Sequence, residues 1–144
     1  CLKALIGHLA SLFWFAPFIS KLIHDLRGVN FTERKSVFIA RNVMLDNRYP
    51  ELVTIGRDVW LTHGVVILTH SFASQYQTDN FQLKEKVAPV TIEEGVFISV
   101  NSIVLPGVTI GKGAYIAAGT VVTQDIPAGV LAAGNPVEIK RSLK

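Results

Sequence analysis

Two histidines lie in the part of the chain that is richest in short aliphatic runs, and one of them closes such a run. His70 ends the stretch that begins at Val65 and comes directly before a polar segment, whereas His63 lies inside the same part of the chain. An imidazole titrates near neutral pH, so it can take up the proton of a reacting hydroxyl or amine. The position of His70 alone is equally compatible with a hydrogen bond that caps a loop, and both interpretations stay open here.

A repeat of six residues predicts the elements that position these histidines. Aliphatic side chains recur at this spacing at Ile55, Leu61, Ile67, Ile92, Ile98, Val104, Ile110, Ile116 and Val122. Small or β-branched residues follow at Val59, Val65, Val96, Ser102, Val108, Ala114 and Thr120. A helix repeats about every 3.6 residues and an amphipathic strand about every 2, so a sustained period of six indicates short flat strands joined by corners.

Three such strands form one triangular coil, and successive coils stack their strands in parallel at about 4.8 Å. The predicted stacks pair Ile92 with Ile110, Ile98 with Ile116, and Val104 with Val122. Gly56 and Gly111 each follow an inward aliphatic residue. We expect the chain to bend there, because a residue without Cβ has a wider range of backbone angles.

The repeat is interrupted twice. The spacing from Leu45 to Ile55 is too long for one hexad, which predicts a small corner insertion around Arg48 to Leu52. The spacing from Ile67 to Ile92 is longer still, so a loop must leave the coil at about residues 71–89. Long loops on rigid repeats often carry function.

Counting hexads places Asp46 and Asn47 in the coil below Leu68 and Thr69, on the same face as His70. From there the two side chains could bind the acceptor or orient the imidazole. The alternative is that they satisfy their own backbone at a corner, as Asp and Asn often do.

The hexad from Ile110 to Tyr115 resembles the hexapeptide motif of left-handed parallel β-helix acyltransferases, such as galactoside, maltose and polysaccharide-pathway O-acetyltransferases. The resemblance extends from Ile39 to Lys144. It implies a mainly β fold whose left-handed coil is an exception to the right-handed crossover rule. It also implies acetyl-CoA as acyl donor without a metal, and His70 as the general base that activates the acceptor for attack on the thioester. His63 takes an outward position and is expected to contact solvent or another subunit.

The C-terminal part resembles the donor site of the same enzymes. Gap-free matching assigns contacts with coenzyme A to Val100, Ala118, Thr123, Gln124 and Arg141. Related enzymes commonly carry lysine at the position of Gln124 and a small residue at that of Val100. The terminal arginine is implied to meet the nucleotide phosphates.

Residues 1–30 form an apolar segment that we expect to be helical, and residues 31–144 form the coil with its loop and a C-terminal tail. Pro17 should kink or restart the helix, and Gly28 should end it. The apolar stretch contains His8 and is slightly short for a membrane span. The segment is expected to pack on the coil or on a second copy, or to lie on a membrane surface.

The composition is that of one globular domain, with 144 residues, 49% hydrophobic and 17% charged. A net charge of +3 and scattered basic residues argue against a nucleic-acid partner. Cys1 is the only cysteine, which excludes an internal disulfide and is compatible with the cytoplasm. Only His63 and His70 lie in the repeat, so the three-histidine zinc site of γ-type carbonic anhydrases, which share this fold, is absent.

The expected function is therefore acetyl transfer from acetyl-CoA to a hydroxyl of a sugar or saccharide. Transfer to the amine of an amino sugar or antibiotic, and a non-catalytic structural or regulatory coil, remain as alternatives. An open coil presents flat faces that need cover, and the resemblance implies a homotrimer with the active site between neighbours.

Overall fold

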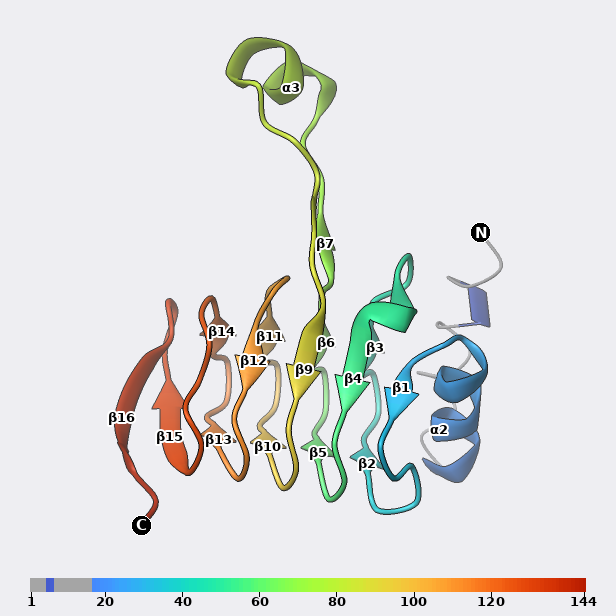
Figure 1. The fold of residues 1–144 in the computed structure, drawn as a ribbon, viewed down its shortest axis with the longest axis vertical. Coiled ribbons are helices and arrows are strands. Elements are labelled where there is room, and N and C mark those ends of the chain that lie inside the picture. Colours follow the sequence, from blue (N-terminus) through green and yellow to red (C-terminus); the bar gives the residue numbers. More distant parts are fainter. Residues whose placement is uncertain (1–4, 7–16) are drawn as a thin grey trace.

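A coil with three flat faces makes up the chain from β1 onward in the computed structural model, which describes residues 5–6 and 17–144 (Figure 1). Face A contains β1 (Asn30–Phe31), β4 (Val53–Ile55), β9 (Val90–Ile92) and β12 (Thr109–Ile110). Face B contains β2 (Phe38–Ile39), β5 (Trp60–Leu61), β10 (Phe97–Ile98), β13 (Tyr115–Ile116), β15 (Val130–Ala133) and β16 (Glu138–Ser142). Face C contains β3 (Met44–Leu45), β6 (Val66–Ile67), β11 (Ile103–Val104) and β14 (Val121–Val122).

The strand register confirms the predicted stacks. Ile92 pairs with Ile110, Ile98 with Ile116, and Val104 with Val122, each in parallel. The predicted inward residues of both kinds are buried, and the hydrophobic ones among them form one continuous core. The period of six therefore reflects the structure of each hexad, in which two positions face the core and the chain then turns a corner.

Gly56 and Gly111 lie at corners, but for a different reason from the predicted one. Neither is among the residues with positive φ, so wider backbone angles are not what the positions require. A Cβ on Gly56 would lie 2.7 Å from the backbone nitrogen of Glu94, and a Cβ on Gly111 would lie 2.5 Å from that of Ala128. Glycine is required because the next coil passes too close for any side chain.

The two interruptions have the predicted places. The corner insertion forms a short 3₁₀ helix, η1 (Pro50–Leu52), between β3 and β4. The long loop leaves between β6 and β9 as two antiparallel arms, β7 (His70–Ser71) and β8 (Lys86–Val87), which carry the helix α3 (Gln75–Phe81) far from the coil (Figure 1). No residue of α3 is buried, so nothing in the described part of this chain covers it.

The helix α2 (Pro17–Leu26) lies at the first end of the coil, beside β1 and β2 (Figure 1). It begins at Pro17, as a restart there predicts, and Gly28 follows its end with φ of 102°. The helix expected before Pro17 lies outside the described residues, apart from 5–6. Within the described ranges, no helix combines the length and apolar character that a membrane crossing requires. At the other end, β16 turns back antiparallel to β15.

Candidate active site

His70 lies at the edge where face C turns into face A, at the root of the long loop. Immediately before it, the N–H of Leu68 donates to the carbonyl of Val104 in the next coil, and Thr69 is buried. His70 then pairs with Val87 on the returning arm of the loop. Its side chain is 16% exposed, so the rigid coil holds the backbone while the imidazole reaches the surface.

Asp46 lies in the adjacent coil and contacts the imidazole directly. The parallel register of Leu45 with Ile67 places it there, as the hexad count predicts. Its Oδ2 lies 2.6 Å from His70 Nδ1 and also accepts from the backbone N–H of Thr69 at 2.8 Å. The Asp46 side chain is fully buried against the imidazole, a position that fits the predicted role of orienting the ring, and substrate binding by Asp46 stays a prediction.

The hydrogen bonds to Asp46 decide the protonation of the pair. Burial by itself would raise the pKa of Asp46, but backbone N–H groups of Tyr49, Thr69 and Arg48, together with His70, lower this pKa to about 2. At neutral pH the carboxylate is ionised and can only accept hydrogen bonds, so Nδ1 of His70 carries the hydrogen. Nε2 is then the basic nitrogen, and it makes no hydrogen bond within the described part of the chain.

Two aromatic rings flank the imidazole. The ring of Phe72 lies 4.6 Å from that of His70, and the ring of Tyr49 lies 5.7 Å away, both measured between centroids and both edge to face. Tyr49 comes from the corner insertion and Phe72 from the loop. The two interruptions of the repeat therefore meet at His70. Tyr49 and Phe72 are functional-site candidates that sequence analysis missed, because neither residue type by itself indicates a contact with the imidazole of a histidine.

Asn47 faces away from His70, toward α2. Its Oδ1 accepts from Arg27 at 2.9 Å, and the same guanidinium donates to the carbonyl of Asp46 at 2.8 Å. Arg27 is only 4% exposed. Its other terminal nitrogen lies 3.0 Å from Nδ1 of His24, where burial, and then the charge of Arg27, lower the pKa of His24 to about 3. His24 is therefore neutral and accepts. Substrate binding by Asn47 stays a prediction.

The buried Arg27 clamps the backbone of the residue that orients the imidazole, and sequence analysis missed it. Arg27 follows the last turn of α2, whereas the atoms it binds come from β3 and the following corner. An arginine that follows an amphipathic helix is expected to be exposed, and no local pattern in the sequence indicates that Arg27 is buried.

The residues predicted to bind the donor divide between two edges and one face. Thr123 and Gln124 follow β14 at the same edge as His70, because Ile67, Val104 and Val122 stack in register. Val100 and Ala118 lie at the edge between faces B and C, in adjacent coils, and are exposed. Arg141 is exposed on β16 and lies opposite Leu131. One copy of the chain does not gather all of these residues around His70.

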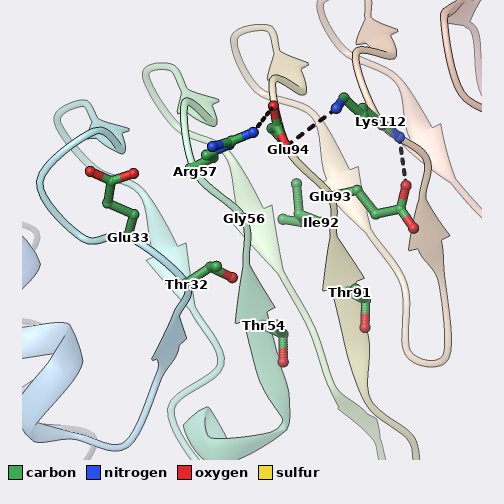
Figure 2. Close-up of a pocket in the computed structure, with 10 residues that line it drawn as sticks. All are labelled: Thr32, Glu33, Thr54, Gly56, Arg57, Thr91, Ile92, Glu93, Glu94 and Lys112. Carbon is green, nitrogen blue, oxygen red and sulfur yellow. Dashed lines mark hydrogen bonds and ion pairs between the residues drawn. The ribbon is translucent and has the colours of Figure 1, made fainter.

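A surface hollow of about 620 Å³ lies at the remaining edge, between faces A and B (Figure 2). Arg57 contacts Glu94 at 2.9 Å and Lys112 contacts the same carboxylate at 3.3 Å, so both cations of the hollow share one carboxylate. Figure 2 shows the hydroxyls of Thr54 and Thr91 farther down the same face. The hollow lies across face A from His70 and is therefore separate from the site around that residue.

Among the described residues, no three His, Cys, Asp or Glu side chains are grouped closely enough to hold a metal ion.

The family model of the bacterial transferase hexapeptide, with six repeats, matches residues 89–124. Residues 89–124 are therefore hexapeptide repeats. The three-faced coil has the expected fold, a left-handed parallel β-helix, as in the solved structures of a Vibrio cholerae hexapeptide-repeat acetyltransferase and a Clostridium difficile maltose O-acetyltransferase.

Proteins similar to this chain include acetyltransferases. A hexapeptide-repeat acetyltransferase of Vibrio cholerae O1 biovar eltor, solved with acetyl coenzyme A, is 31% identical with a TM-score of 0.66, over 81% of this chain and 65% of that one. An inferred acetyltransferase of Schizosaccharomyces pombe is 40% identical over 93 residues, which are 65% of this chain and 44% of the relative. A 2,3,4,5-tetrahydropyridine-2,6-dicarboxylate N-acetyltransferase of Staphylococcus aureus is 52% identical over 52 residues, 36% of this chain and 22% of the relative. The chain spans less than half the length of these two curated relatives.

Proposed function

We propose that this hexapeptide-repeat protein is an acetyltransferase that moves an acetyl group from acetyl-CoA to a hydroxyl of a sugar or saccharide. The observation that carries the proposal is the contact of 2.6 Å between Asp46 Oδ2 and His70 Nδ1 at the root of the loop. It leaves Nε2 as a base with fixed direction. A loop-capping role for His70 would not need a buried, ionised carboxylate behind the ring.

His70 performs the proton transfers in the proposed reaction. Nε2 takes the proton of the acceptor hydroxyl as its oxygen forms a bond to the acetyl carbonyl carbon. The bond from that carbon to sulfur then breaks, and the thiolate of CoA leaves and takes up a proton. Asp46 stays ionised and stabilises the imidazolium that forms, which is the task of a buried carboxylate behind a catalytic histidine.

The chain offers suitable groups for acetyl-CoA. The Vibrio relative binds this donor, which supports the same donor here. Exposed Val100 and Ala118 leave backbone groups at the edge between faces B and C accessible to an extended pantetheine chain. Arg141 on β16 supplies a cation for the phosphates, and Thr123 and Gln124 line the edge that carries His70.

A homotrimer would bring the two edges together, and this assembly is part of the proposal. Face B carries a ladder of aromatic rings, namely Phe38, Trp60, Phe97 and Tyr115, with successive centroids 4.8, 6.2 and 4.8 Å apart. Three of these residues are more than a third exposed, and exposed Phe72, Tyr76 and Phe81 line the loop. A second copy would cover such surfaces. Light scattering at micromolar concentration should give three times the chain mass, and a monomeric mass would contradict the assembly.

Transfer to an amine is the second candidate, since the Staphylococcus relative is an N-acetyltransferase. The base at His70 would serve an amine as well as a hydroxyl. The deciding experiment measures thiol release from acetyl-CoA with sugars, amino sugars and serine as acceptors. Release with hydroxyl acceptors, lost in His70→Ala, supports the proposal. Release confined to amines establishes the second candidate, and acetyl-CoA binding without release from any acceptor would leave a non-catalytic coil.

A further inference from the structure

The corner insertion places an arginine beside the proposed base. Asp46 Oδ1 accepts from the backbone N–H of Arg48 at 2.8 Å and from that of Tyr49 at 3.0 Å. The hydroxyl of Thr69 donates to the carbonyl of Tyr49 at 3.1 Å, and Pro50 is buried. The insertion is therefore bound to the same carboxylate and the same strand end that hold His70.

The guanidinium of Arg48 is held by the two rings that also flank the imidazole. Its Nε donates to the hydroxyl of Tyr49 at 3.1 Å. Its central carbon lies 4.7 Å from the centroid of the Phe72 ring and 5.4 Å from that of Tyr49. The imidazole of His70 lies 4.6 Å from the same Phe72 centroid. A guanidinium held in this way is oriented before any ligand arrives, so less side-chain freedom is lost on binding.

The outer edge of this guanidinium has no carboxylate within ion-pair distance among the described residues. Asp46 is buried and occupied by His70, and Glu85 accepts from the Tyr49 hydroxyl at 3.4 Å instead. A second cation, Lys86, lies opposite Ser71 on the returning arm of the loop, and its ammonium nitrogen lies near Gly107 in the next coil. Arg48 keeps the pair of terminal nitrogens that binds carboxylates and phosphates in a fork.

We infer that Arg48 binds a carboxylate or phosphate carried by the acceptor, so that the acceptor is an acidic saccharide rather than a neutral one. The inference rests on the proposed acetyl transfer and adds the substrate class. The donor also carries phosphates, and these share the chemistry that Arg48 recognises. Arg48 lies at the rings around His70, where the acceptor must lose its proton, which favours the acceptor over the far end of the donor.

The test compares acceptors that differ in one carboxylate. Thiol release from acetyl-CoA is measured with galacturonate against galactose and with glucuronate against glucose, in the wild-type protein, Arg48→Gln and Arg48→Lys. Arg57→Gln is the matched control, an exposed arginine at the edge between faces A and B. We expect wild-type kcat/KM to favour the uronates by about 10- to 100-fold, the scale of a hydrogen bond between charged groups. Arg48→Gln should remove this preference, Arg48→Lys should retain part of it, and Arg57→Gln should leave it unchanged.

Two results would overturn the inference. One is equal use of charged and neutral sugars by the wild-type protein. The other is an Arg48→Gln variant whose KM rises for acetyl-CoA and not for the uronate, which would assign Arg48 to the donor phosphates. If no sugar supports release, NMR titration of the Arg48 and His70 side chains with galacturonate decides. If the wild-type protein binds galacturonate and Arg48→Gln does not, the anion site is supported although the proposed catalysis fails. If the wild-type protein does not bind galacturonate, the anion site is rejected as well.

Discussion

Oδ2 of Asp46 and Nδ1 of His70 lie 2.6 Å apart, although their residues are separated by a corner insertion, three strands of the coil and the corners between them. The parallel stacking of β3 on β6 produces this contact. Because Asp46 is ionised and buried, the tautomer and direction of the imidazole are determined before substrates bind.

Replacement of His70 by alanine should lower acetyl transfer by about 100-fold or more, the usual scale for loss of a general base. The oligomeric mass and the affinity for acetyl-CoA should not change, because the ring supports no part of the core. Thiol release measures the acetyl transfer, and light scattering measures the oligomeric mass. His63→Ala is the control, since His63 is exposed at an outward corner. Full activity of the His70 variant would reject the assignment.

Replacement of Asp46 by asparagine should reduce turnover by about 10- to 100-fold, because the neutral amide no longer stabilises the protonated imidazole. The loss should appear in kcat, while the KM for acetyl-CoA stays unchanged. An unaltered pH profile of kcat/KM in this variant would show that the carboxylate does not act through His70.

The same variant should change the response of folding to acid. The pKa of Asp46 is lowered from 3.8 to about 2, so its ionised form stabilises the folded state above about pH 4. This stabilisation decreases as the pH falls toward 2, where the folded carboxylate takes up a proton. Urea unfolding of the wild-type protein between pH 5 and 2 should show the decrease, and Asp46→Asn should show a smaller one. Parallel curves would mean that other carboxylates dominate.

Arg27→Met should destabilise the protein by about 3 kcal/mol, because it leaves buried carbonyls of β3 and the next corner without a donor. We expect activity to fall as well, since the backbone of Asp46 loses its clamp. Urea unfolding and thiol release give the two readouts. Arg34→Met is a control, because the ion pair of Arg34 with Asp25 is partly exposed and such pairs contribute about 1 kcal/mol or less.

Arg141→Ala should weaken the affinity for acetyl-CoA by about 10-fold, while turnover at saturating donor changes little. The arginine is exposed on the last strand, so no loss of stability is expected. Isothermal titration with CoA and saturation kinetics separate the two effects. A normal affinity in this variant would place the phosphates elsewhere.

Gly111→Ala should destabilise the coil by about 3 kcal/mol, because the new Cβ would lie 2.5 Å from the backbone nitrogen of Ala128. Gly113→Ala is the matched comparison two residues away. Gly113 has φ of 65° and open space around it, so alanine there costs only the strain of that backbone angle, about 1 kcal/mol. Equal losses of unfolding free energy in the two variants would contradict the role of close approach at Gly111.

The sequence by itself determined the coil, because the spacing of six residues between inward aliphatic side chains is visible without any knowledge of the tertiary structure. It also determined the stacks of Ile92 on Ile110 and Val104 on Val122, and the places of the two interruptions. Because Leu45 stacks on Ile67, counting hexads also predicts that Asp46 and His70 lie close together.

Only the tertiary structure decided what these residues do to one another. In the folded chain the side chain of Asp46 contacts His70, whereas the side chain of Asn47 contacts Arg27. The hexad count does not predict the direction in which each of these side chains leaves the corner. The tertiary structure also brought Tyr49, Phe72 and Arg48 around the imidazole. Insertions and loops obey no period, so their side chains are positioned by packing and hydrogen bonds between segments far apart in the chain.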